Sequence, residues 1–268
     1  MVHVAVYADE NYFDDGYILL GGYVASVDEW IKIVPPWNSI LAEHPAVPYF
    51  SNHGFKSQKW CTENGIQLTD MPLLLEKRKK LAHLISTSGV LFAAQTRMWR
   101  SHFEEQILSR LLARKNPRYA LLRDPYYFCY VRLIAVLLYH LPRINEGLPE
   151  QERLAPLDVF VDDNGKLAKR ASELFHDIKE AADPARRVLM GTAASLDDTQ
   201  TVPLQCADLY VAQWREFYST GATTDALQLL TAQPFRPPFF SVGLEWTREK
   251  LKEFADGLLD LPENHWLR

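Results

Sequence analysis

Short apolar runs rich in β-branched residues alternate with longer helical stretches along this chain, and this alternation limits the folds that it can adopt. We predict five strands, over residues 2–8, 17–25, 89–98, 157–161 and 187–196. Strands that alternate with helices form a sheet covered by helices. The turn signal Asp14-Asp15-Gly16 joins the first two strands as a hairpin-like unit, so the α/β sheet should be mixed rather than fully parallel.

Helices are predicted over residues 28–42, 71–86, 101–115, 125–142, 166–182, 203–218 and 247–259. Pro35-Pro36 should kink or split the first of them, because proline lacks an N–H and clashes with the preceding turn. Residues 44–69 show no clean period and should be irregular, and residues 234–240 should form an aromatic, proline-rich loop. Gly21-Gly22, inside the second strand, suggests a β-bulge.

Length and composition favour one globular domain over 1–268, with a core over about 2–218 and a C-terminal helical extension over 219–268. Hydrophobic residues make up 47% and charged residues 24%, which excludes a disordered, collagenous or coiled-coil chain. The apolar stretch 126–141 is too short to span a bilayer and should be a buried helix. The sparse cysteines Cys61, Cys129 and Cys206, and a start without a signal-peptide pattern, predict a cytoplasmic protein with no membrane association.

Charge is distributed unevenly along the chain. The formal net charge of −5 excludes a basic coat over the whole surface. Residues 76–132 nevertheless carry 12 Lys/Arg against 4 Asp/Glu. This excess predicts either solvated helix faces or a surface that faces a polyanion, DNA or RNA, at the rim of a catalytic site. No P-loop, Gly-x-Gly-x-x-Gly, His-Glu-x-x-His or Cys-x-x-Cys pattern occurs, so the sequence does not support a nucleotide-cradling loop or a zinc site.

Acidic residues directly follow two of the predicted strands. Asp9-Glu10 follow the first strand and Asp162-Asp163 the fourth, while Asp208 lies in an apolar segment of a predicted helix. Functional groups collect at the carboxyl ends of strands in open α/β sheets, and neighbouring strands lie ~4.8 Å apart. Asp9 and Asp162 could therefore share a divalent ion, with Asp208 completing the cluster.

Crowded carboxylates repel one another, and a proton or a cation must relieve the repulsion. Mg²⁺ or Mn²⁺ on oxygen ligands can activate water and stabilise the leaving oxygen in phosphodiester cleavage. Asp9, Asp162 and Asp208 are therefore candidate metal ligands and catalytic residues. Each also has a purely structural explanation: turns or helix caps for Asp9 and Asp162, and a buried pair with an arginine for Asp208.

Five short segments, residues 6–10, 21–24, 159–162, 195–198 and 203–209, follow one another in a characteristic order. Together they resemble the family catalogued as domain of unknown function 3800, which is placed with the ribonuclease H-like superfamily. The resemblance covers the chain from Val2 to about Tyr218 and implies a ribonuclease H-like mixed sheet with helical insertions. The sequence departs from the family pattern where Asn11-Tyr12 replaces Ser-Gly and Asp198 replaces Ser.

The resemblance implies a role for each matching acid. Asp9 and Asp162 would be strand-borne metal ligands, and Asp208 the helix-borne one. Glu10, Asp163 and Asp197 would be second ligands or outer-shell acceptors, and Gln205 would orient Asp208 or touch the substrate.

In the segment 50–56, His53 or Lys56 could face the site, although a surface loop is the simpler interpretation. The implied activity is that of a divalent-metal-dependent nuclease or phosphodiester hydrolase acting on nucleic acid. The alternative is a catalytically inactive ribonuclease H-like module that binds nucleic acid or protein. DNA versus RNA, and the oligomeric state, stay open.

Overall fold

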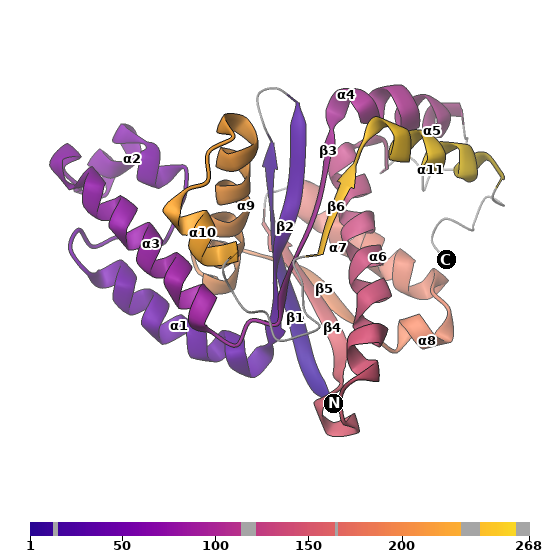
Figure 1. Cartoon of the computed structure of the whole chain (residues 1–268), viewed down its shortest axis with the longest axis horizontal. Helices are drawn as coiled ribbons and strands as arrows, with labels where there is room; N and C mark the ends of the chain where they lie inside the picture. Colours follow the sequence, from indigo (N-terminus) through magenta and orange to yellow (C-terminus); the bar gives the residue numbers. More distant parts are fainter. Residues whose placement is uncertain (13–15, 114–121, 164–165, 232–241, 261–268) are drawn as a thin grey trace.

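The computed structural model describes residues 1–12, 16–113, 122–163, 166–231 and 242–260, and within them six strands form one mixed sheet (Figure 1). The order across the sheet is β5-β4-β1-β2-β3-β6. The strands are β1 (Val2–Tyr12), β2 (Tyr17–Ser26), β3 (Phe92–Trp99), β4 (Leu154–Asp162), β5 (Met190–Leu196) and β6 (Val242–Trp246). The predicted α/β class, a mixed sheet flanked by helices, is confirmed.

Strand directions place most strand ends at one edge of the sheet. β2 runs antiparallel to both β1 and β3, whereas β4 is parallel to β1, β5 to β4 and β6 to β3. The carboxyl ends of β1, β3, β4, β5 and β6 therefore lie together, at the edge where β2 begins. Asp9, three residues before the end of β1, and Asp162, the last residue of β4, meet at this edge.

The prediction of five strands was wrong, because β6 lies in the segment that was expected to be a helical extension. β6 is only five residues long and pairs with β3, where Ala94 is the partner of Val242. A pairing between such distant residues leaves no local pattern for sequence analysis to detect. The chain beyond residue 218 thus completes one edge of the sheet and adds a short unpredicted helix, α10 (Asp225–Thr231).

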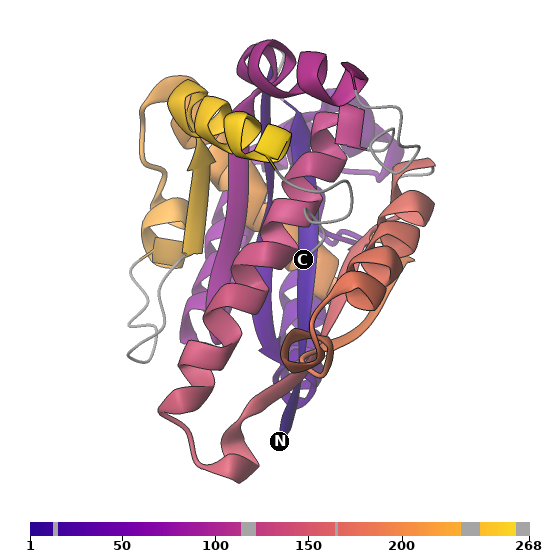
Figure 2. The same cartoon turned by 90° about the vertical axis from the view of Figure 1, so that its right-hand side faces the viewer.

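Helices cover both faces of the sheet (Figures 1 and 2). One face carries α1 (Val27–Ala42), α2 (Gln58–Glu63), α3 (Met71–Thr87), α9 (Val202–Thr220) and α10, with the short turns η1 (Gly54–Lys56) and η2 (Leu68–Asp70). The other carries α4 (Arg100–Phe103), the π-helical η3 (Glu104–Leu108), α5 (Ser109–Ala113), α6 (Pro125–Glu146), α7 (Lys166–Ala181), α8 (Pro184–Arg187) and α11 (Arg248–Asp260). A 3-10 turn, η5 (Glu150–Glu152), precedes β4.

The central strand β1 separates two hydrophobic cores. Val6 and Ala8 point toward α6, whereas Ala5 and Tyr7 point toward α1 and α9, because successive side chains of a strand face opposite sides. By the same alternation Asp9 faces α9 and Glu10 faces α6.

Two helices continue through internal prolines. α1 is not split at Pro35-Pro36, and α6 continues past Pro142 to Glu146. In α1 the buried side chains of Trp30 and Ile33 precede the prolines and those of Trp37 and Leu41 follow them, so both halves are held in the core that α1 shares with α3, α9 and the sheet.

Helix α6 is long and apolar enough to cross a membrane by length and composition alone. Its side chains are nevertheless mostly buried, and Phe128, Leu133 and Leu141 belong to the core on its face of the sheet. α6 is thus the buried core helix that the sequence predicted.

Much of the basic excess over residues 76–132 is used inside the fold. Lys77 is only 2% exposed, and its Nζ donates to the carbonyl oxygens of Ile40, Leu41 and Glu43 at 2.6, 2.9 and 2.8 Å. These carbonyls lie at the end of α1, where the helix leaves its last acceptors without intrahelical partners. Lys77 therefore caps α1 from α3.

Other basic side chains of this segment pair with acids, most of them far away in the sequence. The pairs are Arg78–Glu216, Lys79–Asp225, Lys80–Glu43, Arg97–Glu245, Arg100–Glu104 and Arg110–Asp256. Arg114, Lys115 and Arg118 lie outside the described residues. In the described part of this segment, most of the basic side chains are therefore paired with acids of the same chain.

Replacing Lys77 by Met should destabilise the fold by about 2–4 kcal/mol, because the apolar stem stays while three carbonyls at the end of α1 lose their buried, charged donor. Lys80→Met is the matched control, since Lys80 is an exposed residue of the same helix in a surface ion pair and should cost less than ~1 kcal/mol. Urea denaturation measures both. Equal losses for the two variants would show that Lys77 does not act as a cap.

Candidate acidic site

Asp9 and Asp162 lie side by side on neighbouring parallel strands. Ala8 of β1 pairs with Val161 of β4, so the two aspartates follow at the next position of each strand. Ala8 and Val161 face the α6 side, which turns Asp9 and Asp162 to the α9 side of the sheet. The expected meeting of these two acids on adjacent parallel strands is thus observed, although β1 continues past Asp9 to Tyr12, whereas the prediction ended that strand at Ala8.

Asp208 reaches the same side of the sheet from α9. Its neighbours Cys206 and Leu209 pack in the core between α9 and the sheet, and its Oδ2 accepts the backbone N–H of Asn52 at 2.9 Å. The sequence left open a buried pair between Asp208 and an arginine, and in the structure a backbone N–H takes the role of that arginine. The charge of Asp162 is among the causes that raise the pKa of Asp208, which links the helix to β4 electrostatically.

Two glycines of β2 allow close approaches to neighbouring elements, Gly21 to α9 and Gly22 to β1. A Cβ on Gly21 would lie 3.1 Å from Cε1 of Tyr210 in α9, and one on Gly22 would collide with the carbonyl oxygen of Tyr7. The β1–β2 register runs unbroken through both glycines, so the expected bulge is not present there. Gly21 pairs with Asp9, which places the contact with α9 directly beside the acids.

Burial and mutual repulsion raise the pKa values of the acids. For Asp9 burial is the largest cause, followed by the charges of Asp208, Glu10 and Asp162, and together they hold its pKa well above the usual range. Burial and the charge of Asp198 raise the pKa of Asp162 to about 6. Burial, partly opposed by the Asn52 N–H, raises the pKa of Asp208 to about 7, with added repulsion from Asp198 and Asp162.

These mutual effects define one group, which we call the acidic cluster: Asp9, Asp162, Asp198 and Asp208. Burial, other carboxylates and backbone N–H groups account for the pKa shifts of Asp9, Asp162 and Asp208. An oxygen-only donor set of this kind suits a hard divalent cation such as Mg²⁺ or Mn²⁺. In the described part of the chain, however, no three His, Cys, Asp or Glu side chains stand as a ready-made group of metal ligands. Binding a cation there would require the carboxylates to draw closer.

The secondary candidates lie around the cluster rather than in it. Glu10 is buried on the α6 face, where its charge contributes to the raised pKa of Tyr127, although it also raises the pKa of Asp9. Asp163 is exposed beyond the end of β4. Asp197 is exposed too, and its Oδ1 accepts from the backbone N–H and the hydroxyl of Thr199 at 2.9 and 2.6 Å, which stabilises a turn.

Gln205 holds three segments together. Its buried Oε1 accepts from Trp37 Nε1 at 2.9 Å and from the backbone N–H of Phe50 at 3.0 Å, and its Nε2 donates to the carbonyl of Asp198 at 2.9 Å. The sequence suggested that Gln205 orients Asp208 or touches the substrate. Its hydrogen bonds instead fix the backbone of Asp198 and the segment that leads to Asn52.

Sequence analysis missed two members of the site. Asp198 is half-buried and raises the pKa values of Asp162 and Asp208, yet only its exposed neighbour Asp197 was singled out. Asn52 binds Asp208 and buries its own side chain, whose Oδ1 makes no hydrogen bond within the described residues.

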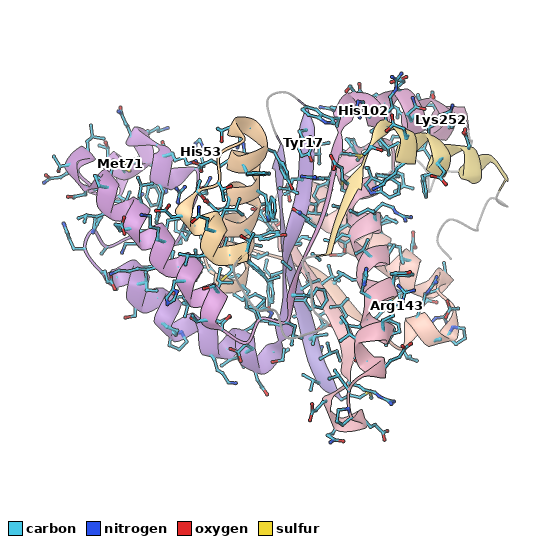
Figure 3. All side chains as sticks on the ribbon, in the orientation of Figure 1. Tyr17, His53, Met71, His102, Arg143 and Lys252 are labelled. Carbon is cyan, nitrogen blue, oxygen red and sulfur yellow. The ribbon has the colours of Figure 1, made fainter. Side chains whose placement is uncertain are left out.

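Within the described residues, His53 and Lys56, the candidates that the sequence suggested in this segment, do not bind Asp208. Lys56 pairs with Glu216 at 2.9 Å, and His53 is exposed on the α9 side of the sheet (Figure 3). The two adjacent acids at positions 197 and 198 are visible in the sequence, but no local sequence pattern shows which of their side chains turns inward.

No family model, curated protein or solved structure matches this chain. The chemistry of the site is therefore argued from its own residues.

Asp208→Asn should stabilise the protein at about pH 8 and have a smaller effect at about pH 5. A carboxyl whose folded pKa is raised to about 7 contributes stability below its unfolded pKa of about 4, and this contribution is lost as the pH rises through 7. Asparagine removes the charge and keeps an acceptor for the Asn52 N–H. Thermal unfolding at both pH values measures the difference, with Asp28→Asn, an exposed acid of α1, as the matched control. A lower Tm of Asp208→Asn at pH 8 would contradict the repulsion.

Proposed function

We propose that this chain is a divalent-metal-dependent nuclease or phosphodiester hydrolase that holds Mg²⁺ or Mn²⁺ at the acidic cluster. The observation that carries the proposal is the meeting of Asp9, Asp162 and Asp208, from two strands and a helix, at one edge of the sheet. Carboxylates crowded in this way bind a cation well because it relieves their repulsion.

The strand order supports a ribonuclease H-like sheet. An antiparallel meander β1-β2-β3 is followed by β4 and β5, which add in parallel on the other side of β1. The resemblance to the domain of unknown function 3800 family implies the same arrangement, with acids on the first and fourth strands and on a later helix. At one departure from that pattern, Asp198 in place of Ser adds a carboxylate to the cluster.

The residues of the chain prepare the site for this chemistry. When bound, a divalent cation activates water and neutralises charge on a phosphodiester. The Asn52 N–H holds one oxygen of the Asp208 carboxylate, and Gln205 holds the backbone that carries Asp198. With a pKa of about 7, Asp208 must release a proton before it can bind a cation at neutral pH.

A second candidate is a catalytically inactive ribonuclease H-like module that binds nucleic acid or protein. One observation favours it: the described residues hold no ready-made group of three metal ligands. The two candidates differ in metal binding, since an inactive module has no need of a cation at these acids.

Asp9→Asn, Asp162→Asn and Asp208→Asn should each lower cleavage of nucleic acid at least about 100-fold, or about 2.7 kcal/mol of transition-state free energy, because each removes a charge that binds the cation. The assay is single-turnover cleavage of labelled single- and double-stranded DNA and RNA with Mg²⁺, Mn²⁺ or EDTA. Asp28→Asn, which lies outside the cluster, should keep the rate of the parent.

Cleavage that survives EDTA, or that proceeds at the parent's rate in Asp162→Asn, would place any activity elsewhere. Binding of nucleic acid without cleavage under any of these conditions would favour the inactive module.

Mn²⁺ should raise the Tm more at about pH 8 than at about pH 5. Protons compete with the cation at Asp162 and Asp208, whose pKa values are about 6 and 7, so the cation binds best when both are ionised. Differential scanning fluorimetry with and without Mn²⁺ measures the effect, and Asp208→Asn should reduce it. An equal shift at both pH values would point to binding outside the cluster.

A further inference from the structure

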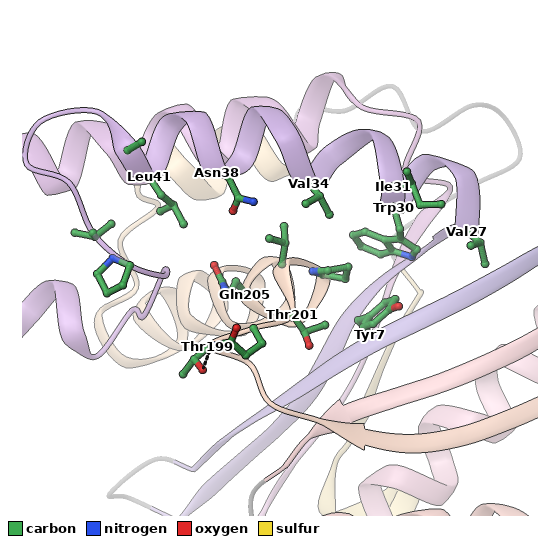
Figure 4. Close-up of a pocket in the computed structure, with 16 residues that line it drawn as sticks. Tyr7, Val27, Trp30, Ile31, Val34, Asn38, Leu41, Thr199, Thr201 and Gln205 are labelled. Atoms are coloured by element: carbon green, nitrogen blue, oxygen red, sulfur yellow. Dashed lines mark hydrogen bonds between the residues drawn. The ribbon is translucent and has the colours of Figure 1, made fainter.

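A cavity of about 580 Å³ lies between α1 and the start of α9 (Figure 4). Its walls come from α1, from Val47 and Pro48 after that helix, from Tyr7 of β1, and from residues 199–205. Cavities of roughly 300–1,000 Å³ hold small organic ligands or parts of larger ones. The cavity is thus large enough for a ring system with a sugar attached.

The cavity adjoins the acidic cluster along two segments of the chain. Tyr7 lines it and lies two residues before Asp9 on the same face of β1, a step of ~6.6–6.8 Å along a strand. Thr199 also lines it and directly follows Asp198. A ligand seated in the cavity could therefore extend a neighbouring group to the acids.

The lining of the cavity is uncharged. None of its residues is Asp, Glu, Lys, Arg or His. Apolar walls come from Trp30, Val34 and Pro203, and the rings of Tyr7 and Trp30 meet edge to face with centroids 5.1 Å apart. The cavity therefore suits a neutral group with flat apolar faces.

A polar side chain also enters the cavity. Asn38 points from α1 toward the start of α9 in Figure 4, and its amide makes no hydrogen bond within the described residues. Thr199 and Thr201 bring hydroxyls to the other wall. An amide offers a donor and an acceptor side by side, the pattern that reads the edge of a nucleobase.

We propose that this cavity binds the base of a nucleotide whose phosphate lies at the acidic cluster; the inference rests on the proposed function. A nucleotide joins a neutral, planar base to an anionic phosphate, and the structure places an uncharged cavity beside a site suited to a cation. A base can enter such a cavity only when it is unstacked. The substrate class that follows is single-stranded nucleic acid, cleaved next to the seated base.

Nucleoside binding tests the cavity without metal and without cleavage. The ¹⁵N-labelled protein in EDTA is titrated with adenosine, cytidine and uridine, and with ribose as the baseless control. At least one nucleoside should shift the backbone amide signals of the non-proline residues within 34–42 and 199–205, and ribose should shift none. Asn38→Ala should weaken that binding about ten-fold through loss of the paired hydrogen bonds.

Two further variants of α1 complete the test. Asn38→Trp fills the cavity from an exposed helix position and should abolish nucleoside binding, whereas Ser39→Ala, its exposed neighbour outside the cavity, should leave it unchanged. The parent should also cleave single strands at least about ten-fold faster than duplex, because unpairing a base costs free energy.

The outcomes separate this inference from the proposed function. Nucleoside binding that depends on Asn38, in a protein that cleaves nothing, would support the cavity and overturn the nuclease. Metal-dependent cleavage without signal shifts up to the solubility limit of each nucleoside, or with shifts confined to other residues, would overturn the cavity and leave the nuclease standing.

Discussion

The close approach of α9 to the centre of the sheet is the contact on which the acidic site depends. Gly21 has no side chain to hold Tyr210 away from β2, and Gly22 lets β1 and β2 pair without a clash at Tyr7. Asp208 lies two residues before Tyr210 and Asp9 pairs with Gly21, so the same contact sets the distance between helix and strand acids. A Cβ at position 21 would crowd Gln95 Cβ and the Ala94 carbonyl oxygen of β3, at 2.9 and 3.0 Å, as well as Tyr210, so a larger residue would disturb both β3 and α9 beside Asp9.

The part of the site that the sequence could predict follows from the two-residue alternation of side chains along a strand. An acid at the end of a buried strand is visible in the sequence, and adjacent parallel strands bring two such acids together, as for Asp9 and Asp162. The alternation also separates Asp9 from Glu10, which the sequence had left as a second ligand. The proposed roles of these acids in catalysis stay predictions, whereas their meeting at one edge is observed.

The parts that escaped prediction depend on pairings between distant residues. Asn52 holds Asp208 through its backbone N–H. Gln205 accepts hydrogen bonds from Trp37 and Phe50, which lie more than 150 positions earlier in the sequence. β6 is recognisable only through its pairing with β3. No window of local sequence contains both members of such a contact, so propensity and periodicity cannot reveal it.

Charge counted along the chain does not show how the charges are arranged in space, for the same reason. The basic excess at 76–132 suggested either solvated helix faces or a surface for a polyanion, and in the described residues Arg97 pairs with Glu245, Arg110 pairs with Asp256, and Lys77 turns inward to cap α1. A count along the sequence registers the basic residues but not the distant acids that pair with them in the folded chain. In the acidic cluster, by contrast, no basic side chain is among the causes of the pKa shifts, and the carboxylates, uncompensated, raise one another's pKa values.

That uncompensated charge links the stability of the fold to its proposed function. Asp9 lies near the carboxyl end of the central strand, and folding brings Asp162 and Asp208 against it at a cost in free energy that grows as the pH rises through their pKa values. The two cores on either side of β1 offset this cost. A cation that binds carboxylates already brought together and partly desolvated recovers part of it, so the repulsion that weakens the metal-free fold would strengthen binding of the metal.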